Sequence, residues 1–329
     1  MRDIPPLLVD ERARVEMTTS CRDCDVIPKV TGAGKVVQID NEHVQLMHNG
    51  LKVKAGGYYG DWMIEIIERL GGHHEPQEEL VFHTLMDFFP KNGRMIELGA
   101  FWSYYSIWFM LGHPERRALG IEPDPAHIEI GKKNAALNGV QLEIRQGFLG
   151  SEGPATAPFQ TEQSGILEIP RLAAADLCCE FAPEGLDLLH VDTQGAETGV
   201  IANCESLLMK GAIRFMLVST HSETISGSPL THQECLELIG DYGGRVLEEH
   251  DVHESFSGDG MIAAYFGHDP IDWPKLDLSY NRYSHSLFRN PIFDLAEVRR
   301  SLAEMEADSK PPLTGSQVKK TWLNRLMGT

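Results

Sequence analysis

Four short apolar runs of the sequence end in residues that can bind a ligand or move a proton. The first run passes Glu97 and stops at Gly99, the second stops at Glu122, the third at Asp192 and the fourth at His221. Such runs are typical of parallel strands covered on both faces. Because the carboxyl ends of parallel strands form the ligand edge of an open α/β sheet, we expect these groups to lie at one edge.

The first two ends favour a nucleoside-like ligand. Glu122 follows Glu97 by about 25 residues, and its carboxylate accepts hydrogen bonds side by side, as two ribose hydroxyls require. Gly99 allows a tight turn and a close approach of the backbone. The helix expected to begin near Ser103 favours a negative group at its N–H groups. Phe148 follows the expected strand at 142–147, and it either holds an adenine ring or packs in the core. For the first end, the alternative is a strand-to-helix turn that binds no ligand.

The later ends favour proton transfer or metal binding. If the strands that end at Asp192 and His221 are neighbours, the two side chains meet. The pair then deprotonates a hydroxyl, with His221 as the base, or holds a divalent metal. His190 lies two residues before Asp192 and shares its face. A structural role for the histidine is the alternative.

Residues 76–267 must position these groups, because they alternate strand and helix patterns as βαβ units do. We expect strands at 94–99, 117–123, 142–147, 185–192, 213–221, 245–249 and 260–267. We expect helices at 78–89, 103–112, 125–139, 196–211 and 231–243. No helix separates the last two strands, which predicts an edge hairpin on an otherwise parallel sheet.

The two ends of the chain have different patterns. Residues 1–75 predict a small β-rich cap, with a hairpin at 48–50 and a helix at 61–72. Residues 268–329 predict a tail with an aromatic, turn-rich part and an amphipathic helix at 293–307. We expect the tail to pack on the main domain or on another subunit.

Composition excludes several classes of protein. The 329 residues carry a net charge of −19, which argues against nucleic acid as the main partner. No run approaches the roughly 20 apolar residues of a membrane span, and the N-terminus is too charged for a secretory signal, so we expect a cytoplasmic protein. Cys21 and Cys24 form a single pair, which is too few ligands for a zinc site, and Cys178 and Cys179 are expected to be buried by packing.

A family resemblance covers roughly residues 75–266. The segments 96–106, 120–139 and 188–201 resemble, in order and spacing, the FkbM family of S-adenosylmethionine-dependent methyltransferases. The family's first motif is Asp/Glu-x-Gly-Ala-Asn-x-Gly-x-x-Ser, and Glu97, Gly99, Ala100 and Ser106 match it.

The sequence departs from the family at three positions. Phe101 stands where asparagine is usual and Ser103 where glycine is usual. The later motif, Asp-x-Glu-Gly-Ala-Glu, appears as residues 192–197 with Gln194 in place of an acid. We expect departures in the first motif, at Phe101 and Ser103, to change how the methionine part of the cofactor is held.

The resemblance implies a Rossmann-like sheet of seven strands in the order 3-2-1-4-5-7-6. It also implies O-methylation of a hydroxyl on a sugar, glycan or natural product, with S-adenosylmethionine as the cofactor. The implied cofactor-binding residues are Glu97, Gly99, Ala100, Phe101, Ser103, Ser106, Glu122, Phe148 and Asp192. Asp192 and His221 face the acceptor as catalytic groups or as ligands of a divalent metal. A homo-oligomer is compatible with the tail.

Other functions remain as alternatives. A dinucleotide-dependent oxidoreductase is disfavoured because no Gly-x-Gly-x-x-Gly occurs, and a hydrolase because no Gly-x-Ser-x-Gly occurs. A non-catalytic binding module is compatible with Phe101 and Ser103. The acceptor pocket is expected among Tyr58, Tyr59, Trp62, the loop 222–230 and the aromatic tail.

Overall fold

The computed structural model describes residues 10–282, 285–288 and 291–308. The chain divides into two compact units, Met1–Arg289 and Asn290–Thr329.

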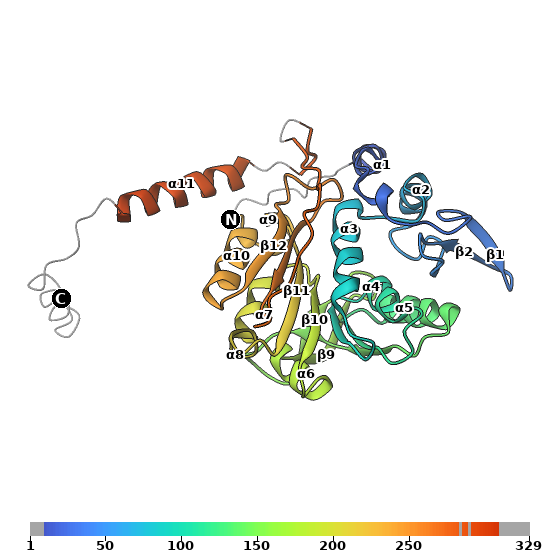
Figure 1. The fold of residues 1–329 in the computed structure, drawn as a ribbon, viewed down its shortest axis with the longest axis horizontal. Coiled ribbons are helices and arrows are strands. Elements are labelled where there is room, and N and C mark those ends of the chain that lie inside the picture. Colours follow the sequence, from blue (N-terminus) through green and yellow to red (C-terminus); the bar gives the residue numbers. More distant parts are fainter. Residues whose placement is uncertain (1–9, 283–284, 289–290, 309–329) are drawn as a thin grey trace, which may run out of the picture. The chain divides into compact units, whose positions relative to one another are not determined.

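Within the described residues, a seven-stranded sheet forms the centre of the first unit (Figure 1). Its strands are β4 (Arg94–Leu98), β5 (Arg117–Glu122), β6 (Glu143–Gln146), β10 (Leu186–Val191), β11 (Ile213–Thr220), β12 (Arg245–His250) and β13 (Gly260–Tyr265). Their order across the sheet is β6-β5-β4-β10-β11-β13-β12. β13 is antiparallel to β11 and β12, and the other neighbours are parallel. The predicted order 3-2-1-4-5-7-6 and the edge hairpin are confirmed.

The sheet is covered on both faces, which explains why its strands are nearly all apolar. Successive residues of a strand point to opposite faces of the sheet, so Met95 and Ile96 belong to two separate buried clusters. One cluster includes residues of α3 (Pro76–Leu85), α4 (Tyr104–Met110) and α5 (Pro125–Asn138). The other includes residues of α6 (Ala174–Phe181), α7 (Glu197–Asn203), α8 (Glu205–Met209) and α10 (Thr231–Asp241). The short α9 (Glu223–Ser226) follows β11.

The helix α5 shows why the local sequence determines where a helix starts and stops. Asp124 caps its first turn by accepting a hydrogen bond from the backbone N–H of Ala126 at 2.9 Å. Pro125 occupies the first helical position, where its missing N–H costs nothing. Gly139 ends the helix in a left-handed conformation, with φ 66°. The predicted helix at 125–139 is confirmed.

The segment before α3 combines a small sheet with two helices. β1 (Val36–Ile39), β2 (Glu42–Leu46) and β3 (Lys52–Lys54) form an antiparallel sheet. It contains the predicted hairpin, and α2 (Asp61–Arg69) is the predicted helix. The helix α1 (Glu11–Ser20) and the 3₁₀ turn η1 (Asp23–Val26) were not predicted, because α1 carries no clear apolar stripe. Met47 and Ile66 are buried in the same cluster as Met95.

A second unpredicted sheet follows β6. Within the described residues, β7 (Phe148–Leu149), β9 (Ile166–Leu172) and β8 (Thr156–Gln160) form it, with β9 in the centre. In β8 and β9 most side chains alternate between exposed and partly buried, so the sequence lacks the apolar runs of the main sheet. This sheet supplies part of the wall of the site described below.

The tail divides between the two units. Ile271, Trp273, Leu276 and Leu278 pack against the first buried cluster, which confirms packing of this part on the main domain. The predicted amphipathic helix is confirmed as α11 (Pro291–Asp308) in the second unit. Among the helices that the structure describes, none is long and apolar enough to cross a membrane.

Candidate functional site

A cavity of about 480 Å³ opens at the carboxyl edge of the main sheet. The predicted residues that line it are Glu97, Gly99, Ala100, Phe101, Glu122, Phe148, Asp192 and His221. Tyr58, Tyr59, Trp62, Ser222, Ile225 and Phe288 also line it, so all three parts of the expected acceptor pocket contribute. Ser103 and Ser106 are fully buried and do not line it.

Gly99 is required by the approach of two strands. Its φ is 84°, and a Cβ atom at this position would lie 1.6 Å from the carbonyl oxygen of Asp192. The approach is close because β4 and β10 are neighbours and Glu97 is paired with His190. No side chain fits between these backbones, so the glycine is a structural requirement of the site.

The loop after Gly99 adopts a left-handed backbone with unusual residues. Phe101 has φ 35° and Ser103 has φ 60°. These are the positions where the family resemblance has asparagine and glycine, which adopt such conformations more easily. The loop therefore has the backbone conformation that asparagine and glycine favour. This conformation costs about 1–3 kcal/mol of strain at each of the two non-glycine residues, Phe101 and Ser103. The ring of Phe101 stacks on His127, with centroids 3.6 Å apart.

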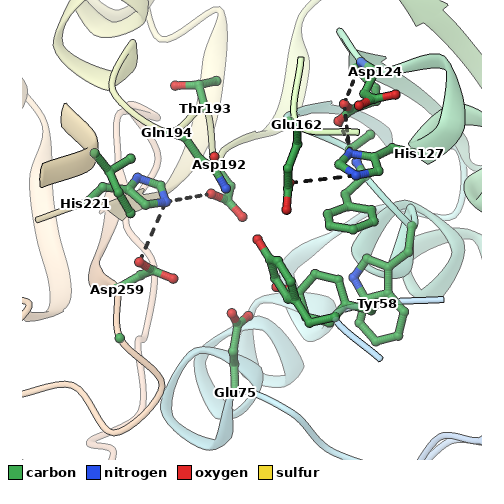
Figure 2. A pocket seen from close by; sticks show the side chains of 18 of the residues that line it. Tyr58, Glu75, Asp124, His127, Glu162, Asp192, Thr193, Gln194, His221 and Asp259 are labelled. Atoms are coloured by element: carbon green, nitrogen blue, oxygen red, sulfur yellow. Dashed lines mark hydrogen bonds and ion pairs between the residues drawn. The ribbon is translucent and has the colours of Figure 1, made fainter. Parts of the chain in front are cut away.

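The cavity has three corners, and the first is the Glu122 corner, formed by Glu122, Asp124, His127 and Glu162. Figure 2 shows the last three of these residues. Glu122 accepts a hydrogen bond from the backbone N–H of Phe101 at 3.0 Å and from that of Asp124 at 2.9 Å. These two bonds use different carboxylate oxygens, and Oε1 also lies 3.3 Å from His127 Nδ1, so the oxygen that retains a further lone pair is Oε2. Glu122 is therefore fixed in place and can still accept a hydrogen bond from a ligand.

The Asp259 corner consists of Asp192, His221 and Asp259 (Figure 2). His221 Nε2 lies 3.2 Å from Asp192 Oδ1 and 3.7 Å from Asp259 Oδ1. Its Nδ1 lies 2.9 Å from Glu197 Oε1. The structure brings Asp192 and His221 together because β10 and β11 are neighbours. Their catalytic role stays a prediction.

The carboxylates around His221 determine its charge. Burial alone would lower the pKa of His221, but Asp259, Asp192 and Glu197 outweigh it and raise the pKa well above the usual value. Burial raises the pKa of Asp259 to about 7, assisted by the charge of Asp192 and opposed by that of His221. At neutral pH the corner thus holds an imidazolium beside a carboxyl group that can gain or lose a proton.

Asp259 and Glu197 are site residues that sequence reasoning missed. Asp259 directly precedes β13, and β13 runs against its neighbours, so its first residue lies at the edge where the parallel strands end. The predicted edge hairpin was the signal that could have identified Asp259. Glu197 closes the turn after β10, since its carboxylate accepts hydrogen bonds from the backbone N–H of Gly195 at 2.9 and 3.0 Å.

The Glu75 corner consists of Glu75, His74 and Tyr58. Tyr58 was expected in the acceptor pocket, whereas Glu75 and His74 were missed, and Figure 2 shows Glu75 and Tyr58. Glu75 Oε2 accepts a hydrogen bond from the Tyr105 hydroxyl at 2.9 Å and lies 3.3 Å from His74 Nε2. His74 Nδ1 lies 2.7 Å from Glu79 Oε1. Burial alone would lower the pKa of His74, but Glu75 and Glu79 raise it to about 10. A protonated His74 thus holds Glu75 in a fixed position.

Glu97 lines the cavity but is more buried than Glu75. It is only 3% exposed, and its Oε2 accepts a hydrogen bond from the backbone N–H of Ser106 at 3.1 Å. Burial raises the pKa of Glu97 to about 7, against the lowering effects of His190 and Ser106. The neighbouring His190 lies with Nε2 2.9 Å from Glu78 Oε1.

Potential metal ligands gather at a different place. Among the described residues, His48, His73 and Glu79 form the one set of three whose ligand atoms all lie within 4.8 Å of one another. All three are buried and none lines the cavity. The metal predicted at Asp192 and His221 stays a prediction.

The cysteines do not contribute to the cavity. Cys21 and Cys24 are buried free thiols, and Cys178 is buried as predicted. The prediction for Cys179 is wrong, because this side chain is exposed. Adjacent residues of the helix α6 point in different directions, so only one of the pair faces the core.

The charged lining of the cavity is mainly acidic. Seven carboxylates line it: Glu75, Glu97, Glu122, Asp124, Glu162, Asp192 and Asp259. Within the described residues, Arg14 is the one Lys or Arg side chain of the lining. Its guanidinium donates to the carbonyl oxygen of Ser257 and lies over the rings of Trp62 and Phe288. Such a cavity suits a cationic ligand and disfavours phosphate groups.

Comparisons with known proteins give weak likenesses. No protein-family model matches the sequence, and no curated protein matches it. Similar solved structures include cofactor-bound Rv0187 from MTB, with 15% identity over 59% of this chain and 80% of that one, and a TM-score of 0.39. Precorrin-6y C5,15-methyltransferase from Geobacter metallireducens has 12% identity over 57% and 88%, with a TM-score of 0.37. TrmK from M. capricolum, bound to S-adenosyl-homocysteine, has 10% identity over 75% and 95%, with a TM-score of 0.36. At TM-scores below 0.5, none of these likenesses supports an argument about this chain.

Proposed function

We propose that this chain is an S-adenosylmethionine-dependent methyltransferase that methylates a hydroxyl of a sugar, glycan or natural product. The observation that carries the proposal is the cavity itself. It places the acid that follows the second strand opposite the acid–histidine cluster formed by the fourth, fifth and seventh strands. The resemblance of segments 96–106, 120–139 and 188–201 to the FkbM family supports the same function.

The acidic lining fits this cofactor better than a dinucleotide. S-adenosylmethionine carries a sulfonium and an ammonium group, and carboxylates attract both. A dinucleotide carries a pyrophosphate, which the mainly acidic lining would repel. The cavity therefore argues against the oxidoreductase alternative.

Residues of the Glu122 corner would hold the adenosine part. Glu122 can accept a hydrogen bond from a ribose hydroxyl at Oε2, which has a free lone pair. Phe148, which stacks on Phe159 with centroids 4.9 Å apart, presents an aromatic edge to the same cavity. We propose that this pair of rings contacts the adenine.

The Asp259 corner would take the acceptor. When bound, the cofactor supplies an activated methyl group. Asp259 would accept the proton of the acceptor hydroxyl, and the cofactor would supply the methyl group to the hydroxyl oxygen and leave as its demethylated product. A carboxylate whose pKa is about 7 suits this task near neutral pH.

His221 would position the two aspartates. Its raised pKa makes it an imidazolium at neutral pH, so it has no free lone pair with which to accept a proton. We therefore assign the base to Asp259 in place of the predicted His221. A divalent metal at Asp192 and His221 is the second candidate, because a metal also lowers the pKa of a bound hydroxyl.

A binding test separates this function from its alternatives. Calorimetric titration with S-adenosylmethionine and S-adenosylhomocysteine should show one site for each. If neither binds, the methyltransferase proposal fails. If both bind and no acceptor is ever methylated, the chain is a non-catalytic binding module, the alternative that Phe101 and Ser103 suggested.

A further inference from the structure

Glu75 presents a carboxylate oxygen without a hydrogen-bond partner to the cavity, among the residues that the structure describes. The side chain is 14% exposed and lines the cavity just before α3 begins. Both of its close contacts, from Tyr105 and His74, are made to Oε2. Within the part of the chain that the structure describes, Oε1 has no hydrogen bond. A ligand can therefore take this oxygen without breaking a protein contact.

The carboxylate is held rigidly and in its ionised form. His74 and Tyr105 lower the pKa of Glu75, although burial alone would raise it. Glu79 fixes His74 in turn, because its Oε1 also accepts a hydrogen bond from the backbone N–H of His74 at 2.7 Å. This Glu79–His74–Glu75 chain leaves the oxygen little freedom to turn away. A preorganised charged acceptor binds a cation without a reorganisation cost.

No lysine or arginine balances the charge of Glu75 within the described lining. Arg14 contacts Ser257, Trp62 and Phe288. The charge of Glu75 helps to raise the pKa of Asp259, another acid of the lining. The imidazolium of His74 offsets part of the charge of Glu75 at Oε2, so the free Oε1 suits a group that donates a hydrogen bond and carries positive charge.

The cavity has as many corners as a sulfonium ion has substituents, and Figure 2 shows labelled residues of each corner. In the proposed function, residues of the Glu122 corner would hold the adenosyl substituent, and those of the Asp259 corner would face the acceptor. The third substituent is the amino-acid chain, and the remaining corner is that of Glu75. We propose that Glu75 binds the α-ammonium group of the cofactor, an inference that rests on the proposed function.

Glu97, which the family resemblance implies as a cofactor-binding residue, is a poorer candidate for this group. Glu97 is 3% exposed and already accepts a hydrogen bond from Ser106, so an ammonium group has less access to it. Glu75 has both the free oxygen and the exposure. The Glu97 carboxylate instead secures the start of α4.

The test compares three ligands in the full chain by calorimetry. S-adenosylhomocysteine has the ammonium group, its deaminated analogue lacks only that group, and 5′-methylthioadenosine lacks the whole amino-acid end. Glu75→Gln keeps the shape of the side chain and removes its charge. We expect Glu75→Gln to weaken S-adenosylhomocysteine by at least tenfold, or about 1.4 kcal/mol, and to leave the other two ligands within twofold.

Two further variants keep the test decisive. Glu75→Asp retains the charge and should recover part of the affinity for S-adenosylhomocysteine. Tyr105→Phe removes one hydrogen bond to Glu75 and should weaken the same ligand alone, by a few fold. If Glu75→Gln does not fold, as judged by thermal melting, these two variants decide.

The outcomes separate this inference from the proposed function. If the wild-type chain binds neither S-adenosylhomocysteine nor 5′-methylthioadenosine, the proposed function fails and this inference fails with it. If the wild type binds both and Glu75→Gln leaves the preference for the ammonium-bearing ligand unchanged, only the inference fails. An equal loss for all three ligands would also overturn it, by assigning Glu75 to structure.

Discussion

Replacing Asp259 with asparagine removes one carboxylate from the cavity and keeps the shape of the side chain. If Asp259 accepts the acceptor proton, Asp259→Asn should lower kcat by roughly 10²–10⁴-fold, the usual contribution of a positioned general base. Cofactor binding should change little, because Asp259 lies in the corner opposite the one that we assign to adenosine.

The wild-type kcat/KM should increase with pH, because Asp259 can accept a proton only when it is ionised. With a pKa of about 7, roughly half of Asp259 is ionised at pH 7. The wild-type kcat/KM should therefore rise about tenfold per pH unit below pH 7 and level off above it. This step should be missing from the residual activity of Asp259→Asn.

The thermal stability of Asp259→Asn shows whether a loss of activity comes from lost catalysis or from a damaged fold. The folded pKa of Asp259 is raised above the ordinary value of 3.8. Ionising the group thus costs stability, and this cost grows as pH rises from about 4 to 7. Asp259→Asn should unfold at the same or a higher temperature than the wild type at pH 8. A variant that stays folded, binds cofactor and transfers methyl groups at the wild-type rate would refute the base assignment.

Three further substitutions test other parts of the site. Glu122→Gln should weaken S-adenosylhomocysteine by roughly tenfold to a hundredfold in calorimetry, since charged hydrogen bonds contribute about 1.5–3 kcal/mol, and unchanged affinity would remove Glu122 from the ribose site. Gly99→Ala should lower the free energy of unfolding in urea by several kcal/mol, roughly as for other severe backbone clashes, because its Cβ would meet the carbonyl of Asp192; a wild-type midpoint would contradict the close approach. His221→Gln should reduce methyl transfer more than cofactor binding, and equal losses would assign His221 to structure.

The sequence predicted the framework of the site because that framework depends on patterns local to each strand. Apolar runs and the helices between them gave the strand order, and the strand ends gave Glu122, Asp192 and His221. Their meeting in space followed from the neighbouring positions of β10 and β11.

The remaining site residues depend on contacts between distant segments. Glu75 becomes a fixed carboxylate only through Tyr105 and the His74–Glu79 pair. Asp259 reaches the site because β13 is antiparallel, a direction that the predicted edge hairpin implies but that the residue types near Asp259 do not indicate. The sheet of β7, β8 and β9 escaped prediction because β7 has two residues and many side chains of β8 and β9 are exposed.

Phe101 and Ser103 show that residues can differ from a sequence motif and still keep the backbone conformation that the motif residues favour. Phe101 and Ser103 depart from the family pattern, yet both adopt the left-handed backbone that asparagine and glycine favour. The departure therefore changes the side chains at the cavity and leaves the course of the loop intact. Neither conformation could be deduced from the residue types, which disfavour it.

Transfer of a tritiated methyl group from S-adenosylmethionine to fractionated cell extract tests the central claim most directly. The wild-type chain should label a fraction of small molecules or glycans, and Asp259→Asn should label it at least a hundredfold more slowly. The label should resist mild alkali, because a methyl ether is stable where a methyl ester is not. The absence of any labelled fraction, or equal labelling by the two proteins, would contradict a hydroxyl methyltransferase that uses Asp259.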